Sequence, residues 1–204
     1  MNTPPLPRAS SRRGQVIVLT GPPGAGKSTV AHLLADHLPH SVHLHSDDFW
    51  RYIKRGWIAP YLPEAHEQNR VVVQVLVAAA FGYAQGGYQV ICDGVVGPWF
   101  IESFRATARE RDLPLSYVIL RPDQRTTVER ATSRAGDALT DPEPIRSLHG
   151  QFSNLGAYEA HVLDSSFLTA EATAGSILQG ITAGSYLLHL SDTITDTNDS
   201  IRNS

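Results

Sequence analysis

The chain has 204 residues, a formal net charge of −3 and a single cysteine, Cys92. This length predicts one domain with a full hydrophobic core. The lone cysteine excludes an internal disulfide and is typical of the reducing cytoplasm. The acidic balance argues against nucleic acid as the main partner. The longest apolar run, residues 71–84, contains Gln74 and is shorter than the roughly 20 residues that cross a bilayer, so we expect no membrane partner.

Strands and helices are predicted to alternate along the chain. Each predicted strand is a continuous apolar run, which is typical of a parallel sheet covered on both faces, and the helices between strands imply right-handed crossovers. The expected fold is a three-layer α/β/α sandwich with a five-stranded parallel sheet, and its ligand is expected at the carboxyl ends of the strands. The predicted strands are 15–20, 42–46, 88–93, 115–120 and 161–163, and the predicted helices are 27–38, 64–85, 98–111, 122–135, 142–157 and 169–182.

The two ends of the chain depart from this pattern. Residues 1–13 are rich in proline, serine and arginine and lack the apolar segment of a secretory signal, so they are expected to form a disordered tail. Residues 184–204 are predicted to be a loose C-terminal tail, although 185–190 is ambiguous. The expected domain therefore comprises residues 14–183.

The run GPPGAGKST at residues 21–29 fits the Walker A pattern G-x-x-x-x-G-K-[ST] at every fixed position. An apolar strand precedes it and a helix follows it, which is the context in which this pattern binds phosphate. Glycines let backbone N–H groups approach phosphate oxygens, and the helix N-terminus favours the same anion. Lys27 is expected to reach the β- and γ-phosphates of ATP, and Ser28 to ligate Mg²⁺. The expected nucleotide-binding residues are Gly21, Pro23, Gly24, Ala25, Gly26, Lys27, Ser28 and Thr29.

Aspartates lie at the ends of two predicted strands. Asp47 and Asp48 follow the second strand, and Asp93 ends the third. Phosphoryl transfer to an alcohol needs a group that orients the hydroxyl and accepts its proton, and Asp47 is the predicted base. The alternative is that Ser46 or Asp47 caps the next helix, and Asp48 is interpreted as a cap or a supporting residue. Asp93 fits a Walker B-like position, where its carboxylate is expected to hold Mg²⁺ through water or to bind the acceptor.

Arginines follow the fourth predicted strand, in a region (122–157) interpreted as a lid. Arg130 and Arg134 are four residues apart on one helix face, so they can clamp the charge that develops on the transferred phosphoryl group. Arg125 is a weaker candidate for this role. The alternative is a solvated basic face paired with Glu129. Closure of a lid would exclude water and so prevent hydrolysis of ATP.

The segment 49–70 is predicted to bind the acceptor. A small-molecule pocket needs apolar walls with a few polar anchors, and this segment contains both. Trp99, after the third strand, is predicted to add another wall. The alternative is that these are ordinary core and surface side chains. The predicted acceptor-binding residues in the segment are Trp50, Arg51, Trp57, Tyr61 and Arg70, and Asp47 and Asp93 complete the set.

Histidines crowd the region around the second predicted strand. No pair has His-x-x-x-His spacing within a well-placed helix and no cysteine joins them, so the sequence predicts no histidine metal site. Mg²⁺ carried by ATP is the expected metal. The histidines are His32, His37, His40, His43 and His45, of which the last two share one strand face.

GPPGAGKST, an aspartate after the second strand, CDG at residues 92–94 and an arginine-bearing lid helix together resemble the small P-loop kinases. The plan is similar to that of gluconate and shikimate kinases, chloramphenicol phosphotransferase-like proteins, tunicamycin-resistance (TmrB-like) proteins and the polynucleotide 5′-kinase domain. The resemblance implies the P-loop nucleoside triphosphate hydrolase fold of the nucleoside-monophosphate-kinase type over residues 15–182, and it implies that Asp47 is the base. The run HSDDFW also resembles bacterial kinases without a defined acceptor. The chain lacks the triple-glycine run with which shikimate kinases bind their substrate.

The leading hypothesis is an ATP-dependent kinase that moves the γ-phosphate of ATP to a hydroxyl of a small molecule, such as a sugar acid, a nucleoside-like compound or an antibiotic. An ATP-binding switch or regulatory ATPase is the second possibility, and the guanine motif of GTPases, N/T-K-x-D, is absent from the sequence. A polynucleotide 5′-hydroxyl kinase is disfavoured by the acidic balance. The expected cofactors are ATP and Mg²⁺, and the protein is expected to be a cytoplasmic monomer or homodimer.

Overall fold

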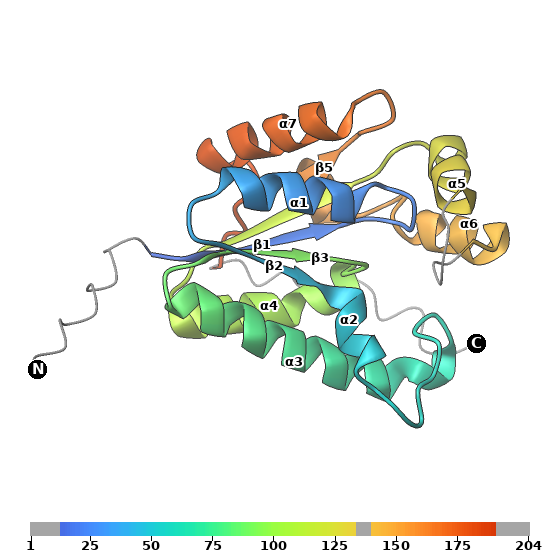
Figure 1. The fold of residues 1–204 in the computed structure, drawn as a ribbon, viewed down its shortest axis with the longest axis horizontal. Helices are drawn as coiled ribbons and strands as arrows, with labels where there is room; N and C mark the ends of the chain where they lie inside the picture. The colour runs from blue at the N-terminus through green and yellow to red at the C-terminus, as the bar shows by residue number, and fades with distance from the viewer. Residues whose placement is uncertain (1–12, 134–139, 191–204) are drawn as a thin grey trace, which may run out of the picture.

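A computed structural model describes residues 13–133 and 140–190 of the chain (Figure 1). Its sheet has five strands in the order β2-β3-β1-β4-β5, and every pair of neighbours is parallel. The predicted three-layer α/β fold is confirmed. The strands are β1 (Gln15–Thr20), β2 (Ser41–His45), β3 (Gln89–Asp93), β4 (Leu115–Leu120) and β5 (Val162–Leu163), and the helices are α1 (Lys27–His37), α2 (Ser46–Arg51), α3 (His66–Gln85), α4 (Pro98–Arg111), α5 (Gln124–Thr132), α6 (Pro142–Gln151) and α7 (Ala170–Thr182), with 3-10 turns η1 (Pro63–Ala65) and η2 (Gly156–His161).

Helices cover both faces of the sheet, with α1 and α7 on one side and α3 and α4 on the other (Figure 1). Successive residues of a strand point to opposite faces. Val16 and Val18 of β1 therefore belong to the core shared with α3 and α4, whereas Ile17 and Leu19 belong to the core shared with α1 and α7. This division explains why residues 16–19 of β1 are apolar at every position rather than at alternate ones.

The helix N-termini follow local signals in the sequence. Asp123 caps α5, with its carboxylate accepting a hydrogen bond from the N–H of Thr126, and Asp141 caps α6 in the same way through Glu143. Pro142 lies in the first turn of α6, where the lack of an N–H costs nothing. The short helix α2 was not predicted from the sequence. Its first turn contains two carboxylates, and negative charge stabilises a helix N-terminus.

The chain beyond α7 packs against the sheet. The N–H of Tyr117 in β4 donates to the carbonyl of Tyr186, and the N–H of Leu188 donates to the carbonyl of Leu115, so this segment runs antiparallel beside β4. The guanidinium of Arg105 in α4 donates to the carbonyl of His189. The folded body therefore extends at least to residue 190, beyond the predicted limit at residue 183, so the first part of the predicted tail at 184–204 is wrong. The remainder of the two predicted tails, residues 1–12 and 191–204, lies outside the described residues. None of the helices that the structure describes is both long and apolar enough to span a membrane.

Candidate active site

The Walker A residues form a loop between β1 and α1. Three of its glycines have positive φ, with values of 143° at Gly21 and 91° at both Gly24 and Gly26, a backbone conformation that side chains with a Cβ rarely adopt. Gly26 is the N-cap of α1, and no side chain caps this helix. The N–H groups of the first turn are therefore available to an anion, as a phosphate-binding loop requires.

Helix α5 packs directly against this loop. A Cβ placed on Gly24 would lie 2.2 Å from the carbonyl oxygen of Thr127, whereas a Cβ on Gly26 would meet nothing within 4 Å. Both glycines have the same φ, so replacing either one by alanine strains the backbone alike. Any additional effect at Gly24 comes from its contact with α5. Helix α5 is thus seated on the phosphate-binding loop through a position that only glycine can occupy.

Gly24→Ala is expected to lower the free energy of unfolding by about 2–4 kcal/mol, because the left-handed backbone alone costs about 1–2 kcal/mol and the contact with Thr127 adds to it. Denaturant unfolding followed by circular dichroism measures the effect. Gly26→Ala is the matched control and should cost only the backbone term, about 1–2 kcal/mol. Equal destabilisation of both variants would contradict close packing of α5 on Gly24.

Lys27 and Ser28 occupy the first turn of α1. Lys27 is only 8% exposed, and its ammonium donates a hydrogen bond to the carbonyl of Pro22, 3.0 Å away within the same loop. The hydroxyl of Ser28 donates to Oδ2 of Asp93 over 2.7 Å. Because β1 and β3 pair with Leu19 opposite Asp93, this carboxylate lies at the strand end next to the loop. The two predicted metal-binding residues therefore come together.

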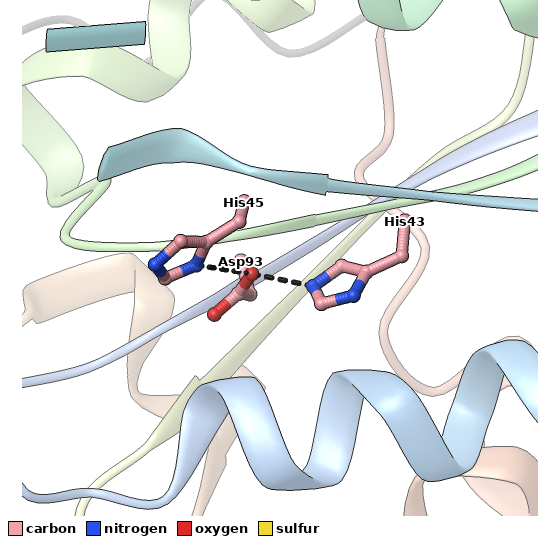
Figure 2. Close-up of side chains that lie close together, drawn as sticks. All are labelled: His43, His45 and Asp93. Atoms are coloured by element: carbon pink, nitrogen blue, oxygen red, sulfur yellow. Dashed lines mark hydrogen bonds and ion pairs between the residues drawn. The ribbon is translucent and has the colours of Figure 1, made fainter. Parts of the chain in front are cut away.

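Asp93 is fully buried and receives three hydrogen bonds. Besides Ser28, its Oδ1 contacts Nε2 of His43 at 2.6 Å and Nδ1 of His45 at 3.0 Å (Figure 2). Burial alone would raise the pKa of Asp93, but the hydrogen bonds from His43, His45 and Ser28 outweigh it and hold the pKa well below its ordinary value. Asp93 is therefore an ionised carboxylate inside the fold, next to the phosphate-binding loop.

The two histidines come from β2, the neighbour of β3. The register places His45 opposite Asp93, and His43 shares the same strand face two residues earlier. The sequence predicts that His43 and His45 share one strand face, but it did not reveal their contact with Asp93. The pKa of His45 is raised above its ordinary value, chiefly by the hydrogen bond to Asp93 and against the effect of burial.

Asp47 lies one residue beyond the first position of α2. Its side chain is 61% exposed, and its Oδ2 is 3.7 Å from Nε2 of His45. The N-cap of α2 is His45 and no side chain caps this helix, so Asp47 does not act as the cap. Asp48 instead accepts a hydrogen bond from Arg51 at 3.0 Å. Asp47 thus presents an exposed carboxylate at the carboxyl end of β2, joined to Asp93 through His45.

The structure describes only one of the two arginines of the predicted clamp. Arg130 donates to the carbonyls of Ser165 and Ser166, at 3.5 and 3.4 Å, in the loop between β5 and α7. Arg125 is exposed and pairs with Glu129 at 3.5 Å, the arrangement of the alternative interpretation. Arg134 lies outside the described residues. The loop that Arg130 contacts also contains Phe167, which is 94% exposed. Phe167 is therefore a candidate for contact with a ligand, and it was not among the predicted site residues.

The predicted acceptor-binding residues divide into two groups. Trp50 is buried, and its indole N–H donates to Asn69 at 2.8 Å, so it supports the fold of the segment. Arg51 and Arg70 form local ion pairs with Asp48 and Glu67. The side chains that remain open to a ligand are the exposed aromatic ones, namely Trp57, Tyr61 and Trp99.

Comparisons with known proteins agree with this architecture. Residues 16–151 match the family AAA_33, an AAA domain. The branch migration subunit RuvB of Thermotoga petrophila is 32% identical over 85 residues, covering 35% of this chain and 25% of RuvB. The cytidylate kinase of Halobacterium salinarum is 27% identical over 122 residues, covering 59% of this chain and 63% of the kinase. The chain thus spans about a quarter of the length of RuvB and less than two thirds of the kinase.

A solved structure extends the likeness to nearly the whole fold. The tunicamycin resistance protein of Deinococcus radiodurans matches with a TM-score of 0.59 over 87% of this chain and 99% of that protein, at 18% identity. Such a distant likeness establishes the fold. The family match covers most of the sheet, the phosphate-binding loop and the helices α5 and α6. The chain therefore belongs to the AAA domain family AAA_33 and shares its fold with the tunicamycin resistance protein.

Proposed function

We propose that the protein is an ATP-dependent phosphotransferase that moves the γ-phosphate of ATP to a hydroxyl of a small molecule. One observation carries the proposal. An exposed carboxylate, Asp47, stands at the strand end beside the buried Asp93, which in turn contacts Ser28 of the phosphate-binding loop. A nucleotide-binding module needs only the loop, whereas a kinase also needs a group for the acceptor hydroxyl.

The phosphates of ATP are bound by the backbone N–H groups of the Walker A loop and the first turn of α1. Lys27 exchanges its hydrogen bond to the Pro22 carbonyl for one to the β- and γ-phosphates. Ser28 and the ionised Asp93 offer hard oxygen donors 2.7 Å apart, a set that fits Mg²⁺, which when bound neutralises charge on the phosphates. Phe167 offers an aromatic face for the adenine ring.

Asp47 orients the acceptor hydroxyl and accepts its proton. Its carboxylate is exposed and is not used to cap α2, so an incoming hydroxyl can reach it. General bases need such access in the substrate-bound state. The neighbouring His45 faces Asp47 with its Nε2, at 3.7 Å, and Asp93 with its Nδ1, at 3.0 Å, which positions Asp47 relative to the phosphate-binding loop.

The acceptor is proposed to lie against the exposed aromatic residues Trp57, Tyr61 and Trp99, whose flat faces suit a sugar or a nucleoside-like ring. The named likenesses, a cytidylate kinase and a tunicamycin resistance protein, favour nucleoside-like and antibiotic acceptors. Arg130 and Arg134 are proposed to neutralise charge on the transferred group when the lid closes.

The test is consumption of Mg²⁺-ATP against a panel of sugars, sugar acids, nucleosides, nucleoside monophosphates and hydroxyl-bearing antibiotics, with the phosphorylated product identified by mass. A product that depends on the enzyme supports the kinase and identifies its acceptor class. Steady release of ADP without any phosphorylated acceptor would instead support the switch or regulatory ATPase, and phosphorylation of a 5′-hydroxyl oligonucleotide would support the polynucleotide kinase.

A further inference from the structure

The side chains of His43, His45 and Asp93 converge on one point. Each offers one ligand atom, and these atoms lie within 4.8 Å of one another. Figure 2 shows the carboxylate of Asp93 between the two imidazole rings. The side chains are 14%, 29% and 0% exposed, respectively, so the cluster is largely withdrawn from solvent. Two paired strands hold all three residues, which makes their spacing rigid.

The chemistry of this cluster differs from that of a magnesium site. Mg²⁺ prefers oxygen ligands and keeps several waters, whereas imidazole nitrogens suit Zn²⁺, Co²⁺ and similar ions. Oδ2 of Asp93 is occupied by the hydroxyl of Ser28, so Oδ1 faces the two imidazoles. Two imidazoles and one carboxylate form a common ligand set for a transition metal, with the remaining positions left to water or a substrate.

Groups beyond the three ligands also fit a metal site. A histidine that binds a metal through one nitrogen usually turns its other nitrogen towards a carboxylate, a carbonyl or water, which fixes the tautomer. His45 faces Asp93 through Nδ1, and its Nε2 is 3.7 Å from the carboxylate of Asp47. The ring of His43 packs edge-on against His32 with centroids 4.6 Å apart, which restrains its orientation. The imidazoles are therefore held in place before any ion arrives.

We propose that His43, His45 and Asp93 bind one divalent transition-metal ion, of the Zn²⁺ or Co²⁺ kind, in preference to Mg²⁺ and without nucleotide. The proposal shares Asp93 and His45 with the proposed kinase function but does not rest on that function. Hydrogen bonding alone is the competing explanation, since protonated imidazole nitrogens would also donate to Oδ1 of Asp93. The two explanations predict different results when an imidazole is replaced by an amide. The amide keeps a hydrogen-bond donor for Asp93 but is a poor ligand for a transition metal, so only the metal site would be lost.

The experiment titrates the full chain, freed of metal with a chelator, with Co²⁺ followed by visible absorption and with Zn²⁺ followed by competition against a chromophoric chelator. An amide of glutamine reaches the place of Nε2, and an amide of asparagine reaches the place of Nδ1. His43→Gln and His45→Asn therefore keep a donor to Asp93 while removing a good metal ligand. The wild type should bind one equivalent, and each variant should bind at least about 100-fold more weakly, beyond the 10–100-fold typical of outer-shell changes.

His37→Gln is the matched control, because His37 is exposed on α1, outside the cluster, and contacts the carbonyl of Leu33. It should bind Co²⁺ and Zn²⁺ like the wild type, and millimolar Mg²⁺ should not displace either ion. Thermal unfolding of the metal-free variants checks that they fold, and either variant alone suffices as the test. Unchanged affinity in either folded variant, no binding by the wild type, or displacement by Mg²⁺ would overturn the proposal. Because the titrations contain no ATP or acceptor, failure of phosphoryl transfer with intact metal binding would count against the kinase function only.

Discussion

Lys27→Ala is expected to reduce ATP turnover by about 10³-fold or more, to the limit of a coupled ADP-release assay. Removing a single donor that stabilises developing charge commonly costs about 10²–10³-fold, and catalysis of phosphoryl transfer consists almost entirely of such positioning and charge neutralisation. The ammonium of Lys27 lies folded over the phosphate-binding loop, 3.0 Å from the carbonyl of Pro22, so it is already held where the phosphates are expected. Turnover is measured with the acceptor identified in the panel.

Arg13→Ala is a suitable control for the loss of one positive charge. Arg13 lies just before the amino-terminal end of β1, whereas the phosphate-binding loop follows its carboxyl end. The side chain of Arg13 pairs with the exposed Asp112 at 2.7 Å. This variant should keep wild-type turnover, because an exposed pair contributes little to stability and is remote from the loop. A Lys27→Ala protein that turns over ATP within a few-fold of the wild type would rule out the assigned role of the Walker A loop.

Asp47→Asn is expected to slow phosphoryl transfer by about 10²–10⁴-fold, the usual contribution of a general base, while leaving nucleotide affinity unchanged. The amide keeps the shape of the side chain but cannot accept the proton of the acceptor hydroxyl. Because Asp47 is 61% exposed and does not cap α2, the substitution should not disturb the fold. Single-turnover measurements of product, together with binding of a fluorescent ATP analogue, separate the two effects.

Asp48→Asn serves as the neighbouring comparison. Asp48 is engaged with Arg51 at 3.0 Å, so its loss should alter transfer far less than that of Asp47. Full transfer activity in Asp47→Asn would show that the base lies elsewhere. An effect confined to Asp48→Asn would move the assignment to the second carboxylate of the pair.

Much of the architecture could be predicted because its signals are local. The boundaries of β1, α4 and β4 follow from continuous apolar runs and from Pro98, and the structure confirms all three. The Walker A pattern likewise indicates its own loop, since glycines with positive φ cannot be replaced without strain. The contact between Ser28 and Asp93 could also be expected, because a parallel sheet places the carboxyl ends of its strands, and the residues that follow them, at the same end.

What could not be predicted depends on which strands become neighbours. His43 and His45 meet Asp93 only because β2 pairs with β3, and this order places β3 between two strands that precede it in the chain. Hydrophobic periodicity contains no information on strand order. Trp50 gives a second example, since burial and its hydrogen bond to Asn69 depend on how α2 packs on α3, whereas the sequence suggested contact with a substrate.

The antiparallel segment beside β4 has a consequence for any shortened form of the protein. Leu115 and Tyr117 at the start of β4 bond to Leu188 and Tyr186 on the side away from β1. A chain cut after Ala183 would leave these backbone groups as an open sheet edge, lined by buried apolar side chains. Unprotected edges pair with other chains, so the truncated protein should self-associate with rising concentration and scatter light where the longer chain remains clear.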